Sequence, residues 1–200
     1  LLSAPYAPSG ERGIILLPSL MLNLHGHETT HGFEADRVLG TEWTLAGGSF
    51  LTSVLPQIGD FQFGSKQVNL TSDSLMNGGV GTFAYDDEGT PGQNVPLVKE
   101  GNWVGLLTSR ETVPQLNSKI GKDYFKHSSG AMRADGYGSW PVIRMVNIIL
   151  EPGETDFEDL KESVPNGTMM LGTNKSWSID YVRRDFSFGL EIAWEKVAGK

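Results

Sequence analysis

Beyond residue 60, short runs of alternating polar and apolar residues separated by turn residues constrain the fold most strongly. Residues 67–71 and 81–85 alternate in this way, and residues 95–99 and 103–107 flank Glu100-Gly101-Asn102. A period of two is typical of half-buried strands, and a short polar turn between two such runs predicts a hairpin. The chain also holds 25 glycines and 10 prolines, which favours many turns over a helix bundle.

The first forty residues follow a different pattern. Residues 13–17 form an apolar run that predicts a short buried strand, and Pro18-Ser19 then predicts the start of a helix with Ser19 as its N-cap. Five residues recur at helical spacings of three and four, which places them on one stripe: Leu20, Leu24, His27, His31 and Glu34. Residues 35–39 extend this helix, and Gly40 is a natural residue for its end.

The remaining segments complete an α+β pattern. We expect a loop over 112–130, strands over 141–150, 176–181 and 186–194, and a short acidic helix over 156–164. The sequence therefore predicts a largely antiparallel β-sheet with one helix near the N-terminus and a second short helix. No long linker divides the chain, so residues 1–200 are expected to form a single domain.

Composition excludes several classes of function. Acidic residues outnumber basic ones by 24 to 16, and the net charge of −8 argues against nucleic acid as a partner. The absence of cysteine excludes disulfides and thiolate metal ligands. Because no apolar run is long enough to cross a membrane and residues 1–10 lack the features of a signal peptide, we expect no membrane association and a cytoplasmic location.

The segment His27-Glu28-Thr29-Thr30-His31 carries the chemistry. It lies in a cluster of three histidines that includes His25, and it matches the pattern H-E-x-x-H. Residues four apart project from one face of an α-helix, so two imidazoles can bind one metal ion. Glu28 is the candidate general base that takes a proton from a metal-bound water. Imidazole and carboxylate donors favour Zn²⁺, one ion per active subunit.

A zinc site needs a third protein ligand, and two carboxylates are candidates. Glu34 follows on the same helical stripe, where it could bind the metal or hold a histidine, and Glu191 comes from a distant strand. Arg133 and Arg144 are candidates for binding a substrate carboxylate or for stabilising an oxyanion, and ordinary ion pairing is the alternative. Trp140, Trp177 and Trp194 are expected to pack in the core.

Seven segments in order resemble the TldD/PmbA family of zinc metallopeptidases, once described as modulators of DNA gyrase. The resemblance covers nearly the whole chain and corresponds to the carboxy-terminal half of a family member. The matching segments are 31–40, 46–50, 85–89, 110–112, 129–134, 144–147 with 150–153, and 177–180 with 186–189.

The resemblance implies a peptidase that acts on unfolded or small peptides and works as a homodimer or a heterodimer with a family homologue. It also reveals two departures. The family spacing is H-E-x-x-x-H, which needs a widened helical turn, whereas this chain offers the spacing of an ordinary α-helix. Many members also have a cysteine ligand where Leu190 stands here. Two hypotheses therefore stay open: a zinc-dependent peptidase, or a non-catalytic partner subunit that forms the peptide-binding cavity without metal.

Overall fold

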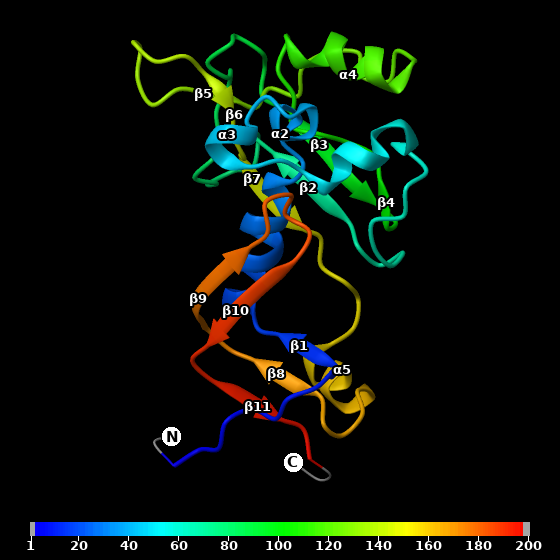
Figure 1. Cartoon of the computed structure of the whole chain (residues 1–200), viewed down its shortest axis with the longest axis vertical. Helices are drawn as coiled ribbons and strands as arrows, with labels where there is room; N and C mark the ends of the chain where they lie inside the picture. Colours follow the sequence, from blue (N-terminus) through cyan, green and yellow to red (C-terminus); the bar gives the residue numbers. More distant parts are fainter. Residues whose placement is uncertain (1–2, 198–200) are drawn as a thin grey trace.

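The computed structural model describes residues 3–197, without the side chains of residues 24–26. One end of the molecule holds a four-stranded sheet with the helices α2, α3 and α4, and the other end holds a three-stranded sheet with α5 (Figure 1). The helix that contains the histidine motif and the hairpin β9–β10 lie between these two ends (Figure 1). The prediction of an α+β fold with mainly antiparallel sheets is confirmed.

The four-stranded sheet is antiparallel throughout. Its spatial order is β4 (Asn102–Trp103), β3 (Asn94–Lys99), β2 (Leu70–Asp73) and β7 (Asn147–Leu150). The predicted hairpin joins β3 to β4, and φ is positive at both Glu100 (49°) and Gly101 (79°). Positive φ at both central residues matches the right-handed twist of paired strands, which explains why this turn closes a hairpin.

The second sheet brings together segments that are far apart in the sequence. Strand β8 (Met169–Leu171) pairs in parallel with β1 (Ile14–Leu16) and antiparallel with β11 (Ala193–Glu195). The predicted acidic helix is α5 (Phe157–Ser163), and the Asp156 carboxylate accepts a 2.8 Å hydrogen bond from the Glu158 N–H as its N-cap. Two further antiparallel pairs complete the strands: β5 (Met132–Arg133) with β6 (Val142–Ile143), and β9 (Asn174–Ile179) with β10 (Phe186–Leu190).

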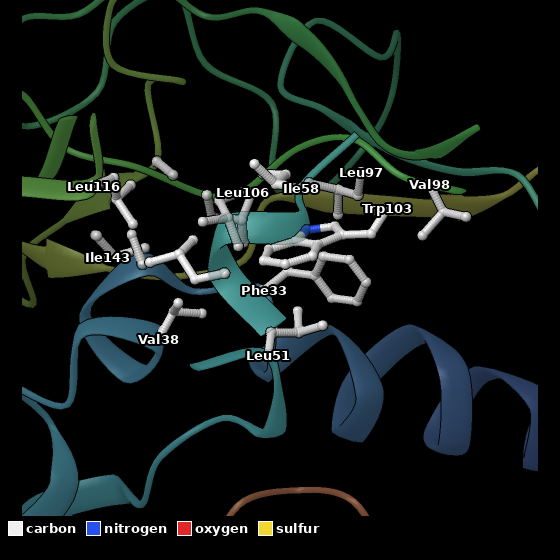
Figure 2. Close-up of a cluster of buried hydrophobic side chains, with 14 of the residues drawn as sticks. Phe33, Val38, Leu51, Ile58, Leu97, Val98, Trp103, Leu106, Leu116 and Ile143 are labelled. Carbon is white, nitrogen blue, oxygen red and sulfur yellow. The ribbon is translucent and has the colours of Figure 1, made fainter. Parts of the chain in front are cut away.

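The largest group of buried apolar side chains lies between the four-stranded sheet and the short helices beside it (Figure 2). Trp103, Phe33 and Leu51 are fully buried there. The indole N–H of Trp103 donates to the carbonyl of Gly105 at 2.7 Å, so its one polar group is satisfied. Since Phe33 follows His31 by two residues, burial of its ring fixes the C-terminal end of the motif segment.

Three helices of the structure were not expected from the sequence pattern. The expectation of a loop over 112–130 is wrong for α4 (Thr112–Ile120), whose Val113 and Leu116 are buried and which ends at Gly121 in the left-handed conformation. Pro114 near its start does not break it, because the first helical N–H groups have no partner within the helix. Two other helices were not predicted: α3 (Trp43–Ala46) and the 3₁₀-helix η2 (Phe50–Gln57).

The helix near the N-terminus differs from expectation at both ends. Its N-cap is Leu17 and not Ser19, because Pro18 takes the first helical position, where its fixed φ is favourable. The helix does not continue to residue 39: the chain turns at Gly32, and α2 (Ala35–Leu39) is a separate helix that ends at Gly40 with φ of 84°. The expected strand over 81–85 is also wrong; within the described residues this segment makes turns and one bridge, between Tyr85 and Pro91.

None of the described helices has both the length and the apolar character that a membrane crossing requires.

Candidate functional site

The histidine motif begins in a widened helix, which contains His27 and Glu28, and His31 lies just beyond the end of that helix. Helix α1 (Pro18–Met21) passes directly into η1 (Leu22–Thr29), a π-helix, which forms i→i+5 hydrogen bonds and holds more residues in each turn than an α-helix. The expectation of ordinary α-helical winding is therefore wrong. Both ends of the segment are tied to strands or loops, through Leu17 N–H to Leu171 O and Leu107 N–H to Phe33 O, each at 2.9 Å. The segment that contains the motif is therefore held at both ends by residues that are distant in the sequence.

The two motif imidazoles lie next to each other. The ring centroids of His27 and His31 are 4.8 Å apart, with the ring planes at 81°. Nδ1 of His27 is 3.0 Å from Glu28 Oε1, and Nδ1 of His31 is 3.0 Å from Glu34 Oε1. An ionised carboxylate only accepts hydrogen bonds, so each Nδ1 carries a proton in these two pairs, and Nε2 is the ring nitrogen left to bind a metal. Histidines that bind metals are commonly held by carboxylates in this way.

Glu34 lies in a buried network that orients His31. Its side chain has no exposed surface, and Arg37 Nε donates to its second oxygen. Arg37 also donates to the Ala46 carbonyl, and its other terminal nitrogen lies 3.4 Å from His31 Nδ1. Burial alone would raise the pKa of Glu34, but the hydrogen bond and charge of His31, together with Arg37, outweigh burial and lower it. Because one oxygen of Glu34 faces His31 and the other accepts from Arg37, Glu34 in this arrangement holds His31.

Arg37 was not identified from the sequence as part of the site. Glu34 and Arg37 are three residues apart, a spacing that brings side chains together on a helix, but here Glu34 is the N-cap of α2 and not a residue of the motif helix. The placement of Glu34 depends on a turn and on its bridge to Leu107, which is far away in the sequence.

A cavity of about 630 Å³ opens beside the imidazole pair. His27, Glu28 and His31 line it, together with the predicted Arg133 and Arg144. The other lining residues come from the motif helix, from the segment leading into β7 and from the β9–β10 hairpin: Leu22, Asn23, Met145, Val146, Ile148, Trp177 and Phe188. One cavity therefore combines imidazole, carboxylate, guanidinium and apolar groups.

The three tryptophans expected in the core are exposed instead. Trp140, Trp177 and Trp194 have exposed fractions of 92%, 59% and 44%. Among the described strands, β9 and β10 pair only with each other, so this sheet is too small to bury its side chains. Trp177 lines the cavity.

The residues fit a metal centre only in part. Within residues 3–197, apart from the side chains of residues 24–26, no group of three or more His, Asp or Glu side chains is arranged to hold a metal ion. The side chain of His25 lies outside the described residues. Glu191 follows β10, is exposed and does not line the cavity, and Leu190 is paired with Asn174 at the end of that strand. The described residues thus supply two imidazole donors and no third ligand.

Comparison with known proteins identifies the family of this chain. The chain is 30% identical over 195 residues to a metalloprotease of Methanocaldococcus jannaschii, which covers 97% of this chain and 39% of that protein. It is 26% identical over 165 residues to a zinc metalloprotease TldD homolog of Saccharolobus solfataricus, covering 82% and 32% of the two chains. The fold is similar to the crystal structure of TldE from Thermococcus kodakarensis, with a TM-score of 0.70 and 16% identity over 92% of this chain and 38% of that one. The chain thus spans about two fifths or less of each of these proteins. A family model for the PmbA/TldA metallopeptidase C-terminal domain matches residues 9–200, and the chain belongs to this family.

Proposed function

We propose that this chain carries the metal-binding and base residues of a zinc-dependent peptidase that hydrolyses unfolded or small peptides. The observation that carries the proposal is the placement of His27 and His31 side by side in one cavity with Glu28. Relatives named metalloproteases, one of them a zinc metalloprotease, support it. A zinc ion, when bound, would polarise the peptide carbonyl and lower the pKa of a bound water.

Each residue has a defined part in this proposal. His27 and His31 would hold the metal through Nε2, because Nδ1 of each ring is bonded to a carboxylate. Glu28 would take the proton of the attacking water, after its carboxylate leaves His27 Nδ1. The third ligand would be Glu34 once released from Arg37, Glu191 after a movement at the end of β10, or a group outside the described residues.

The second candidate function is a non-catalytic partner subunit that forms the peptide-binding cavity without metal. The lack of a third ligand among the described residues favours it. In either case we propose that the protein acts as a homodimer or as a heterodimer with a family homologue, and that it does so in the cytoplasm.

Metal analysis and a peptidase assay separate the two functions. The protein is purified without chelator, and the wild type is compared with His31→Ala, Glu28→Gln and the control His127→Ala, which changes an exposed histidine outside the cavity. For a zinc peptidase, His31→Ala loses the bound metal, whereas Glu28→Gln keeps the metal and loses activity by about 10²- to 10⁴-fold. Substoichiometric metal that is unchanged in His31→Ala, with no cleavage in any variant, would establish the partner subunit instead.

A further inference from the structure

Two arginines lie on one face of the hairpin that borders the cavity. In the β5–β6 pair, Arg133 is opposite Val142. The same register places Arg144 opposite Ala131, and the backbone N–H of Arg144 donates to the Ala131 carbonyl. Residues directly opposite each other and residues two apart share a face of the sheet, so Arg133 and Arg144 are diagonal neighbours on one face. Their Cα atoms are then about 7–8 Å apart, close enough for the two guanidinium groups to reach one ligand group.

Neither arginine forms an ion pair with any described residue. The side chain of Arg144 donates to the Ile143 carbonyl at 2.7 Å, and its remaining N–H groups keep their capacity to donate. The carboxylate among the residues that line the cavity is Glu28, which is hydrogen-bonded to His27. The lining therefore has an excess of positive charge, in a chain whose net charge is −8.

We propose that this cavity selects peptides that carry a carboxylate, and that Arg133 and Arg144 are the residues that determine this preference. The proposal rests on the proposed peptide-binding function of the site. A guanidinium binds a carboxylate through two parallel N–H···O bonds and stays charged at all relevant pH values. The neighbouring apolar surface of Met145, Ile148 and Phe188 would accept the uncharged part of the same peptide. The carboxylate can belong to an Asp or Glu side chain or to a peptide C-terminus.

The test measures binding separately from cleavage. Fluorescein-labelled peptides are titrated with the purified protein in the presence of a chelator, and fluorescence anisotropy gives the Kd. The first peptide contains Glu and has an amidated C-terminus, the second contains Gln in its place, and the third is the Gln peptide with a free C-terminus. The proteins are the wild type, the double variant Arg133→Gln/Arg144→Gln, and the control Arg184→Gln, which removes an exposed charge outside the cavity lining.

We expect the wild type to bind at least one of the two carboxylate peptides about fivefold to tenfold more tightly than the amidated Gln peptide. This preference should disappear in the double variant, persist in Arg184→Gln and weaken as salt is added. Which carboxylate peptide binds more tightly identifies the source of the group. Circular dichroism spectra establish that each variant is folded; if the double variant is not, the single Lys variants at each position must show a reduced preference.

Equal binding of the charged and neutral peptides by the wild type, or an unchanged preference in the double variant, would overturn the proposal, as would the absence of binding to all three. A failure of the zinc peptidase function gives a different result. The protein would then lack metal and cleavage and would still prefer the carboxylate peptide. Conversely, cleavage without such a preference would refute only the role of the arginines.

Discussion

The buried pair of Glu34 and Arg37 allows a sharp test of how the histidine site is supported. Glu34→Gln removes the counter-charge of the Arg37 guanidinium. The Arg37 side chain is only 4% exposed, so its charge stays buried. Removing one partner of a buried ion pair costs about 3–5 kcal/mol, because the remaining charge is left uncompensated. Arg37 still donates to the Ala46 carbonyl, so we expect a loss of about 3 kcal/mol in the free energy of unfolding, at the lower end of that range.

Urea denaturation at pH 7, followed by tryptophan fluorescence, measures this loss. The matched control is Glu158→Gln, which breaks a pair with the same i,i+3 spacing on the surface, where Glu158 is 70% exposed. We expect that control to change the free energy of unfolding by less than about 0.5 kcal/mol.

A double variant separates lost charge from lost packing. In Glu34→Gln/Arg37→Met no charge is left uncompensated, so this protein should be more stable than the single Glu34→Gln variant. If the free energy of unfolding of Glu34→Gln were within about 1 kcal/mol of the wild-type value, the interpretation of Glu34 and Arg37 as a buried ion pair that supports His31 would be wrong.

Two further predictions concern protonation and steric fit. Burial, followed by the charges of Glu34 and then Glu42, raises the pKa of Asp36 to about 7, so the folded state holds a proton between about pH 4 and 7 that the unfolded chain releases. This contribution to stability is complete below about pH 4 and is lost as the pH rises to about 7. The free energy of unfolding of Asp36→Asn should therefore increase relative to that of the wild type over this range, by up to about 4 kcal/mol. Urea titrations that give parallel pH profiles for the two proteins would contradict this. Gly105→Ala should lower the Tm more than Gly40→Ala, because a Cβ at residue 105 would lie 2.1 Å from the Pro96 carbonyl oxygen. Gly40 has a positive φ, but a Cβ there would meet no atom of the described residues within 4 Å outside its chain neighbours. Thermal unfolding of both variants checks the order, and an equal or reversed effect would refute the steric argument.

Local patterns in the sequence determined the turns and helix ends of this protein and the family that it resembles. The β3–β4 hairpin follows from alternation around Glu100 and Gly101, and the end of α2 follows from Gly40, because positive φ is a local property that glycine readily adopts. The N-cap of α5 likewise depends on one side chain beside the helix it caps. The resemblance to the metallopeptidase family depended on residue identities in order, and the family match over residues 9–200 agrees with it.

Tertiary structure decided the winding of the motif helix and the surroundings of its histidines. The spacing of His27 and His31 is compatible with an α-helix, and the π-helix arises in a segment tied at both ends to distant residues. The ion pair between Glu34 and Arg37 depends on the turn at Gly32 and on the bridge from Glu34 to Leu107. The cavity is lined by Arg133, Arg144 and Trp177 because two separate hairpins pack beside it. Sequence periodicity describes which side of a single element a residue faces. The bridge to Leu107 and the cavity join elements that are far apart in the sequence, and only packing of the whole chain sets them.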